Sequence, residues 1–206
     1  MKKIIGIIYK VIYGLYSSSR NAVFNLIFKF SLYCQGADFG ANIKTYGSVP
    51  KISINRKACK VEIGSNVKFN NYDTMGWNSK CAIRVGQGGA LFIDDYSGFN
   101  GACICCFDEI HIGKYVKIGG GTRISDSNHH SLDYLERRED NDPTKVSNKK
   151  IVIEDDVFIG AGCFIGKGVV IGARSIIAQG SVVVKDIPSD CIAAGNPCKV
   201  IKSLNS

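Results

Sequence analysis

Proline is scarce in this chain. Only four of its 206 residues are Pro, whereas 23 are Gly. Turns must therefore be made largely by Gly, Asn and Asp, which favours many short strands over a few long elements. A chain of this length can bury one substantial core, so a single domain with a small appendage is expected.

Acidic residues are missing from the beginning of the chain, where the first is Asp38. The basic residues that precede it are Lys2, Lys3, Lys10, Arg20 and Lys29. Lysine also interrupts both apolar stretches, "IIGIIYKVIYGLY" and "AVFNLIFKFSLY", before either reaches the ~20 residues of a membrane span. We therefore expect residues 1–37 to form a basic amphipathic helical segment that either lies on an anionic membrane surface or packs on the body or another subunit.

A secretory signal is not expected, because Lys10 splits the apolar region and no small-x-small cleavage site follows it. The sequence therefore predicts a cytoplasmic protein that can lie peripherally on the inner membrane face. No nucleic-acid partner is expected.

Paired metal-ligand spacings are also missing. The nine cysteines are an odd number and lie mostly in apolar runs such as "GACICCFD" and "GAGCFIG". This distribution is typical of reduced core thiols rather than of a disulfide framework. Cys103, Cys105 and Cys106 have no second Cys or Cys/His pair at a zinc-binding spacing, so no metal is expected.

A six-residue repeat dominates the C-terminal part of the chain, where "IEDDVF", "IGAGCF", "IGKGVV", "IGARSI", "IAQGSV" and "VVKDIP" follow one another without a gap. Six is not a multiple of 3.6, so the repeat does not fit an amphipathic helix. Each unit is instead predicted to form one short strand and one turn, with its aliphatic residue pointing inward. These aliphatic residues are Ile153, Ile159, Ile165, Ile171, Ile177 and Val183.

Three such units form one triangular coil of a solenoid, and looser units occur upstream. They begin at Ile63, Ile93, Phe99, Ile112 and Ile118. The prediction is an all-β solenoid over residues 38–188 with a C-terminal tail over residues 189–206. The hexad repeat is interrupted after Ile124 and resumes at Ile153, which predicts an excursion loop at about residues 126–150. The repeat also fits poorly around residues 70–82, which predicts a bulge or corner loop there.

The repeats and the ending "AAGNPCKVIK" resemble the hexapeptide-repeat acyltransferases, in particular the sugar O-acetyltransferase branch, over roughly residues 60–202. This resemblance implies a left-handed parallel β-helix and a homotrimer with active sites between subunits. It also implies that acetyl-coenzyme A is the acyl donor and that the acceptor is a sugar hydroxyl, in the biosynthesis of a surface polysaccharide. The basic N-terminal segment suits a lipid-linked glycan.

Two adjacent histidines, His129 and His130, stand at the start of the excursion loop in "DSNHHSLD". Neighbouring side chains of extended backbone point to opposite faces, so the two are not expected to act on the same atom. In the resembling family, the catalytic histidine follows an aspartate by four residues and precedes a small or polar and then an apolar residue. Asp126, His130, Ser131 and Leu132 fill these places, so the resemblance makes His130 the catalytic candidate.

The chemistry expected of His130 is general-base catalysis, because an alcohol attacks a thioester only as its proton is removed. Histidine suits this role because its ordinary pKa is near ~6.5. Either Asp126 or Asp133 is expected to orient the ring, and amides at the glycine-rich corners to stabilise the oxyanion. His129 and His111 are expected to be structural.

The resemblance also suggests residues for binding acceptor and donor. Asn100 occupies a position that often faces the acceptor pocket, whereas Gly98 stands where some relatives carry asparagine, so the acceptor can differ. The positions that match donor contacts are Ala161, Gln179, Val184, Lys185, Lys199 and Lys202. Lys199 and Lys202 stand where relatives carry arginine, and would meet phosphate as point charges rather than as bidentate partners.

Three other functions fit parts of the sequence. The same base and donor site could serve an amino sugar, giving an N-acetyltransferase. A trimeric metal enzyme resembling the γ-class carbonic anhydrases would need His111 to join one of the paired histidines at a metal. A non-catalytic scaffold would use the solenoid and the basic segment only to assemble partners at a membrane.

Overall fold

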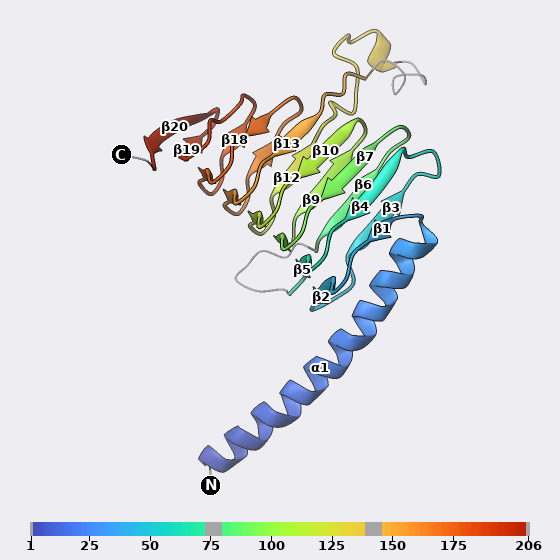
Figure 1. The fold of residues 1–206 in the computed structure, drawn as a ribbon, viewed down its shortest axis with the longest axis vertical. Coiled ribbons are helices and arrows are strands. Elements are labelled where there is room, and N and C mark those ends of the chain that lie inside the picture. Colours follow the sequence, from blue (N-terminus) through green and yellow to red (C-terminus); the bar gives the residue numbers. More distant parts are fainter. Residues whose placement is uncertain (1, 73–79, 139–145, 205–206) are drawn as a thin grey trace.

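Three parallel β-sheets form the sides of a triangular solenoid in the computed structural model, which describes residues 2–72, 80–138 and 146–204 (Figure 1). The first sheet contains β1 (Asp38–Phe39), β4 (Lys60–Ile63), β7 (Ala90–Ile93), β10 (Glu109–Ile112), β13 (Ile151–Ile153) and β16 (Val170–Ile171). The second contains β2 (Lys44–Tyr46), β5 (Lys68–Asn70), β8 (Gly98–Asn100), β11 (Lys117–Ile118), β14 (Phe158–Ile159), β17 (Ile176–Ile177), β19 (Cys191–Gly195) and β20 (Cys198–Ser203). The third contains β3 (Lys51–Ile54), β6 (Ala82–Val85), β9 (Cys103–Cys106), β12 (Arg123–Ser125), β15 (Phe164–Ile165) and β18 (Val182–Val183).

The chain visits the three sheets in turn, so each coil has three edges. We call the edge between the first and second sheets the first edge, that between the second and third sheets the second edge, and that between the third sheet and the first sheet of the next coil the third edge. Each strand except β20 pairs in parallel with an equivalent strand one coil away, as in Lys117↔Phe158 and Ile118↔Ile159 of β11 and β14.

The core is the column of inward aliphatics that the six-residue period predicts, and this prediction is confirmed. The six hexad aliphatics from Ile153 to Val183 are each at most 1% exposed. The second inward position of each hexad is also buried, at Val157, Cys163, Val169, Ser175, Ser181 and Ile187. All nine cysteines are free thiols and five of them are buried, as expected for core residues.

The N-terminal helix, α1 (Lys2–Cys34), closes the open end of the solenoid with its last turns only. Phe28 and Leu32 are fully buried, and the Phe28 ring packs edge-on against Phe69 at a centroid distance of 5.2 Å. Asn25 Oδ1 accepts a hydrogen bond from the Thr45 amide of β2 at 2.6 Å. The first half of the helix projects away from the solenoid (Figure 1).

The predicted excursion leaves after β12 and returns at β13, on the third edge. Its two stems are held together, because Ser127 and Asn148 form an antiparallel bridge and the Lys149 amide donates to the Asp126 carbonyl at 2.9 Å. A short 3-10 helix, η1 (Glu136–Arg138), lies within it. Residues 139–145 of this loop, and residues 73–79 of the poorly fitting stretch, lie outside the described part of the chain.

The opposite end of the solenoid is closed by β19 and β20. These strands pair antiparallel, with Cys191 opposite Ser203, and β19 pairs in parallel with β17. The C-terminal tail is therefore a hairpin that extends the second sheet by two strands.

Candidate active site

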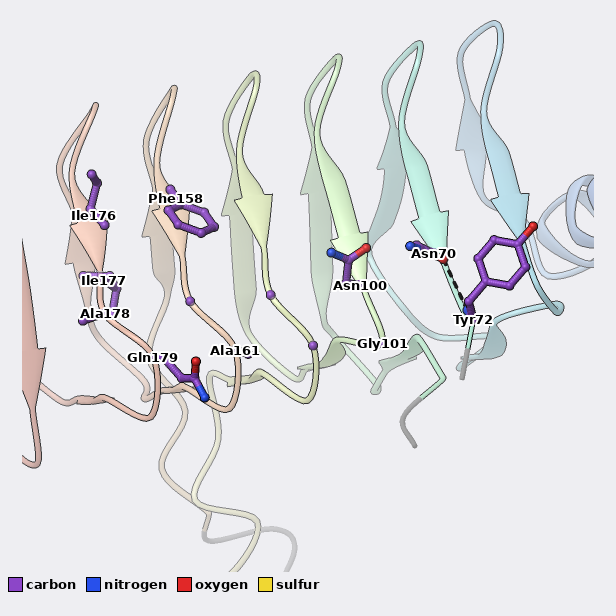
Figure 2. A pocket seen from close by; sticks show the side chains of 13 residues that line it. Asn70, Tyr72, Asn100, Gly101, Phe158, Ala161, Ile176, Ile177, Ala178 and Gln179 are labelled. Carbon is purple, nitrogen blue, oxygen red and sulfur yellow. Dashed lines mark hydrogen bonds between the residues drawn. The ribbon is translucent and has the colours of Figure 1, made fainter. Parts of the chain in front are cut away.

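A cavity of about 530 Å³ lies along the second edge (Figure 2). It crosses successive coils, and each coil contributes residues of its strand in the second sheet or residues that directly follow that strand. The lining residues are Asn70, Tyr72, Asn100, Gly101, Gly119, Gly120, Phe158, Gly160, Ala161, Ile176, Ile177, Ala178 and Gln179.

One position of the coil determines the character of this cavity, namely the residue after the inward residue of each second-sheet strand. Asn70 and Asn100 occupy it in β5 and β8 and are directly opposite each other in the strand register. In the later coils the same position holds Gly119, Gly160 and Ala178. The cavity is therefore lined by amide side chains toward the N-terminal coils and by small residues toward the C-terminal ones.

The small residues are required by the packing of one coil on the next. A Cβ atom on Gly119 would lie 2.5 Å from the Ala161 nitrogen, and one on Gly160 would lie 2.6 Å from the Gln179 nitrogen. The Gly119 and Gly160 amides donate to the carbonyls of Ile159 and Ile177, at 2.8 Å each. These two amides are thus engaged between coils, so an oxyanion role would need other amides of the corner.

Three of the residues that the sequence suggests for substrate binding meet in this cavity. Asn100, the acceptor candidate, and Ala161 and Gln179, the donor candidates, all line it. Figure 2 shows Asn100 on β8, with Gln179 and Ala161 at the corner of later coils.

The other donor candidates lie elsewhere on the single chain. Val184 and Lys185 follow β18 and so stand at the third edge. Lys199 and Lys202 are exposed on β20, opposite Ala194 and Ile192 of β19. Among the described residues, none of these four lines the cavity of the second edge.

Asp126 anchors the start of the excursion loop. Its carboxylate is fully buried and accepts hydrogen bonds from the amides of Phe107, at 2.8 and 3.0 Å, and Asp108, at 2.8 Å. Burial raises the pKa of this carboxyl, and the hydrogen bonds from the two amides oppose the rise. The Asp126 carboxylate thus holds the corner at which the excursion loop begins, four residues before His130, and its part in orienting that ring stays a prediction.

The second carboxylate candidate, Asp133, is exposed, and its Oδ1 accepts a hydrogen bond from the Leu135 amide at 2.8 Å. This bond closes a local turn within the excursion loop. Its part in orienting His130 stays a prediction.

The two adjacent histidines differ in their surroundings. His129 has a φ of 63°, its Nε2 lies 3.0 Å from Ser125 Oγ, and its ring packs edge-on against Phe107 at 5.3 Å. It is thus held against the third edge. His130 is exposed on the loop that begins there. Within the described residues, His130 is not part of the lining of the second-edge cavity, so its catalytic role stays a prediction.

His111 lies on the outer face of the first sheet, where its Nε2 is 3.1 Å from Asp94 Oδ2. It is therefore on a different side of the solenoid from the second-edge cavity. Across residues 2–72, 80–138 and 146–204, no group of three His, Cys, Asp or Glu gathers as a metal site.

Sequence reasoning missed the polar end of the cavity, which Asn70 and Tyr72 form. The Tyr72 hydroxyl accepts a hydrogen bond from Asn21 Nδ2 of α1 at 3.1 Å. This hydrogen bond is the largest of several causes that lower the Tyr72 pKa. A signal was present for Asn70, because it follows an inward Phe just as Asn100 does. Tyr72 carried no such signal, since its place depends on a helix about fifty residues earlier.

Comparison with known proteins agrees with this architecture. The family described as "Bacterial transferase hexapeptide (six repeats)" matches residues 150–185, which hold most of the gapless hexads. The chain is therefore similar to the bacterial transferase hexapeptide family over these residues. Its three parallel sheets form the left-handed β-helix of that family.

Two curated relatives in the family are similar over part of their length. The galactoside O-acetyltransferase of Lactococcus lactis subsp. lactis (strain IL1403) is 36% identical over 110 residues, which are 53% of this chain and 50% of that protein. The 2,3,4,5-tetrahydropyridine-2,6-dicarboxylate N-acetyltransferase of Staphylococcus aureus (strain Newman) is 47% identical over 57 residues, which are 28% of this chain and 24% of that protein. The chain thus spans about half of the first relative and about a quarter of the second.

A family member of known structure is similar over most of its length. The hexapeptide-repeat-containing acetyltransferase of Vibrio cholerae has a TM-score of 0.54 and 28% identity, with 91% of this chain and 90% of that one covered. Its structure complexed with acetyl coenzyme A has a TM-score of 0.51 and 25% identity, with 94% and 85% covered.

Proposed function

We propose that the protein transfers the acetyl group of acetyl-coenzyme A to a hydroxyl group of a sugar, in the biosynthesis of a surface polysaccharide. The observation that carries this proposal is the second-edge cavity, which brings Asn100, Ala161 and Gln179 together. The small residues of the later coils suit the thin pantetheine arm of the donor, and the amide side chains of Asn70 and Asn100 suit the hydroxyl groups of a sugar.

In this proposal His130 removes the proton of the attacking hydroxyl as its oxygen bonds to the thioester carbon. The carbon–sulfur bond then breaks, the acetyl ester forms, and the proton that His130 took passes to the sulfur, so that coenzyme A leaves as the thiol. Asp126 does not touch the reacting atoms. Its carboxylate accepts hydrogen bonds from the Phe107 and Asp108 amides and so holds the start of the excursion loop in place. The position of His130 depends on this start of the loop.

An assay of thiol release from acetyl-coenzyme A, with a panel of neutral, acidic and amino sugars, tests the activity. We expect release that depends on a sugar, with an ester as the product identified by mass spectrometry. An amide product would instead favour the amino-sugar alternative. No release with any sugar, from folded protein that binds coenzyme A, would favour the non-catalytic scaffold.

The site proposed here requires two copies of the chain. In one chain the cavity lies on the second edge, whereas the loop with His130, and Val184 and Lys185, lie on the third edge. These are the two edges that border the third sheet. If three copies pack with their third sheets toward a three-fold axis, the third edge of each copy meets the second edge of its neighbour. We therefore propose a homotrimer in which His130 serves the neighbour's cavity.

We also propose that α1 binds an anionic membrane surface. None of the helices in the described residues combines the length and apolarity that crossing a bilayer requires. The side of α1 that faces away from the solenoid is nonetheless apolar along most of its length, and each residue of this stripe is more than half exposed in the single chain. The apolar stripe consists of Ile8, Ile12, Leu15, Val23, Leu26, Phe30 and Tyr33.

Charge favours lipid over a second copy of the helix as the partner of this stripe. Residues 2–34 contain five basic and no acidic residues. Packing several such helices together would bring like charges close without any acidic partner, whereas anionic headgroups complement them. The buried side of the helix, with Phe28 and Leu32, faces the solenoid, which leaves the apolar stripe for the bilayer.

Co-sedimentation with lipid vesicles tests this orientation. Wild type should bind vesicles that contain phosphatidylglycerol. Ile12→Glu/Leu15→Glu should weaken binding by ~10²-fold or more, because burying each of these side chains is worth about 1.5–3 kcal/mol. Gly14→Glu/Ser18→Glu adds the same charge on another side of the helix and should bind much more tightly than the stripe variant. Equal losses in the two variants would show that the apolar stripe does not contact lipid, and a loss of self-association in the stripe variant alone would make it a subunit contact.

A further inference from the structure

A cationic groove runs across the outer face of the second sheet, away from the donor end of the cavity. A second cavity, of about 290 Å³, shares Asn70, Tyr72 and Asn100 with the first. A third, of about 330 Å³, adjoins the second through Lys68 and Lys117 and reaches the first edge. The three cavities therefore form one path from Gln179, past the two asparagines, to a cluster of lysines.

Three lysines, Lys44, Lys68 and Lys117, line the far end of this path. They occupy the same position in their strands of the second sheet, and we call each such position a rung. Lys44 is opposite Lys68, Lys68 is opposite Gly98, and Gly98 is opposite Lys117. Neighbouring rungs are ~4.8 Å apart, so a ligand of one or two sugar rings can touch all three lysines. Among the described residues, no Asp or Glu lines either of the two cavities that hold them.

Gly98 makes room for Lys117 to reach toward Lys68. A Cβ atom on Gly98 would lie 3.5 Å from Lys117 Cδ and 3.6 Å from its Nζ, so the lysine side chain lies across the glycine rung. Lys117 Nζ donates a hydrogen bond to the Tyr96 carbonyl at 2.8 Å, which fixes its position. Burial, and then the charge of Lys68, lower the Lys117 pKa, as expected for two cations held without an anion between them.

Two tyrosines complete the wall of the lysine cluster. Tyr96 and Tyr115 stack with centroids 4.9 Å apart and an angle of 7° between their rings. Both have positive φ, of 63° and 59°, at corner positions where other coils use residues such as Asn66 and Asp156. A bulky residue in this conformation is unfavourable. The exposed aromatic pair beside the lysines is suited to stacking against a sugar ring.

We propose that this groove binds a negatively charged acceptor, with Lys44, Lys68 and Lys117 holding a carboxylate or phosphate group while a hydroxyl group on an adjoining sugar reaches Asn70 and Asn100. This inference rests on the proposed acetyltransferase function and names the class of its substrate. The charge is carried either by an acidic sugar, such as a uronate, or by the phosphate of a nucleotide-linked or lipid-linked sugar.

Calorimetric binding of paired probes to the full chain tests the charge requirement. For the carboxylate we would compare trigalacturonate with its methyl ester, and for the phosphate we would compare UDP-galactose with galactose. In at least one pair the charged probe should bind about tenfold or more tightly than its neutral counterpart, which corresponds to ~1.4 kcal/mol. The pair that shows the difference identifies the source of the charge. Equal affinities within both pairs would overturn the proposal.

Two double variants separate the lysine cluster from general surface charge. Lys68→Gln/Lys117→Gln should abolish the preference for the charged probe, whereas Lys51→Gln/Lys57→Gln, which removes the same charge outside the cavity lining, should preserve it. Equal losses in both variants would overturn the proposal. Equal acetylation of neutral and acidic sugars, unaffected by the lysine variants, would overturn the charged acceptor and leave the acetyltransferase function in place. Selective binding of a charged probe without any acetyl transfer would support the anion-binding groove and overturn the acetyltransferase function.

Discussion

His130→Ala should lower kcat for acetyl transfer by at least ~10²-fold while leaving coenzyme A binding and the fold intact, because a general base contributes ~10²- to 10⁴-fold to the rate. The donor is expected to bind at the second-edge cavity, whose described lining residues do not include His130. The measurement is the initial rate at saturating acetyl-coenzyme A, together with calorimetric binding of coenzyme A.

His129 is the matched control for this experiment. It adjoins His130, but its ring is held by Ser125 Oγ and Phe107 at the third edge. His129→Asn introduces a residue that tolerates the positive φ at this position, and its kcat should stay within a few fold of the wild-type value. If the His129 variant loses activity and His130→Ala does not, the family motif is misplaced by one residue. If neither variant changes kcat, the general-base assignment is wrong.

The period of the repeat predicted the inward residues well, because the same hexad position meets the same environment in every coil. Ile153 and Ile171 are 18 residues apart, which is one full coil, and both pack in the first sheet. Handedness did not follow from the period, since a triangular coil of either hand buries the same aliphatic residues. It was correctly expected only from the resemblance to the family.

The same arithmetic explains the separation of the suggested site residues over two edges. Ala161 and Gln179 are 18 residues apart and therefore share an edge, whereas Lys185 is six residues after Gln179 and stands at the next one. His130 follows a third-sheet strand and begins at that next edge as well. The spacing in the sequence thus already placed these residues at two different edges, whereas the resemblance alone assigned them to a single site.

Contacts between distant segments could not be predicted from the repeat. Tyr72 enters the cavity beside a residue of α1, and Lys117 crosses the Gly98 rung toward Lys68. α1 lies outside the hexad pattern. Lys68, Gly98 and Lys117 do share one hexad position, but the pattern does not specify the direction in which the Lys117 side chain extends. The two expectations for the N-terminal segment were likewise not exclusive, because its last turns pack on the solenoid while its first half extends away.

Mixing two inactive variants should restore activity if His130 serves a neighbouring chain. One variant is His130→Ala, which keeps its cavity, and the other is Ala161→Trp, which fills the cavity and keeps its histidine. In a cyclic trimer, a site is functional when a chain with an intact histidine precedes one with an intact cavity. Co-expression in equal amounts should therefore yield about a quarter of the wild-type activity, from two parents that each have almost none.

Ala173→Trp is the control for the bulky substitution, because Ala173 occupies the same hexad position as Ala161 at the first edge, outside the lining of the second-edge cavity. Ala173→Trp should remain active. By analytical ultracentrifugation it should be trimeric, and so should the two inactive parents, His130→Ala and Ala161→Trp. If His130 instead acted within its own chain, every chain in the mixture would carry one lesion in its only site, and co-expression would restore nothing. A monomer at micromolar concentration would contradict the trimer itself. Restoration to about a quarter therefore requires both the assembly and the exchange of His130 between neighbouring copies, because neither alone produces an intact site from these two chains.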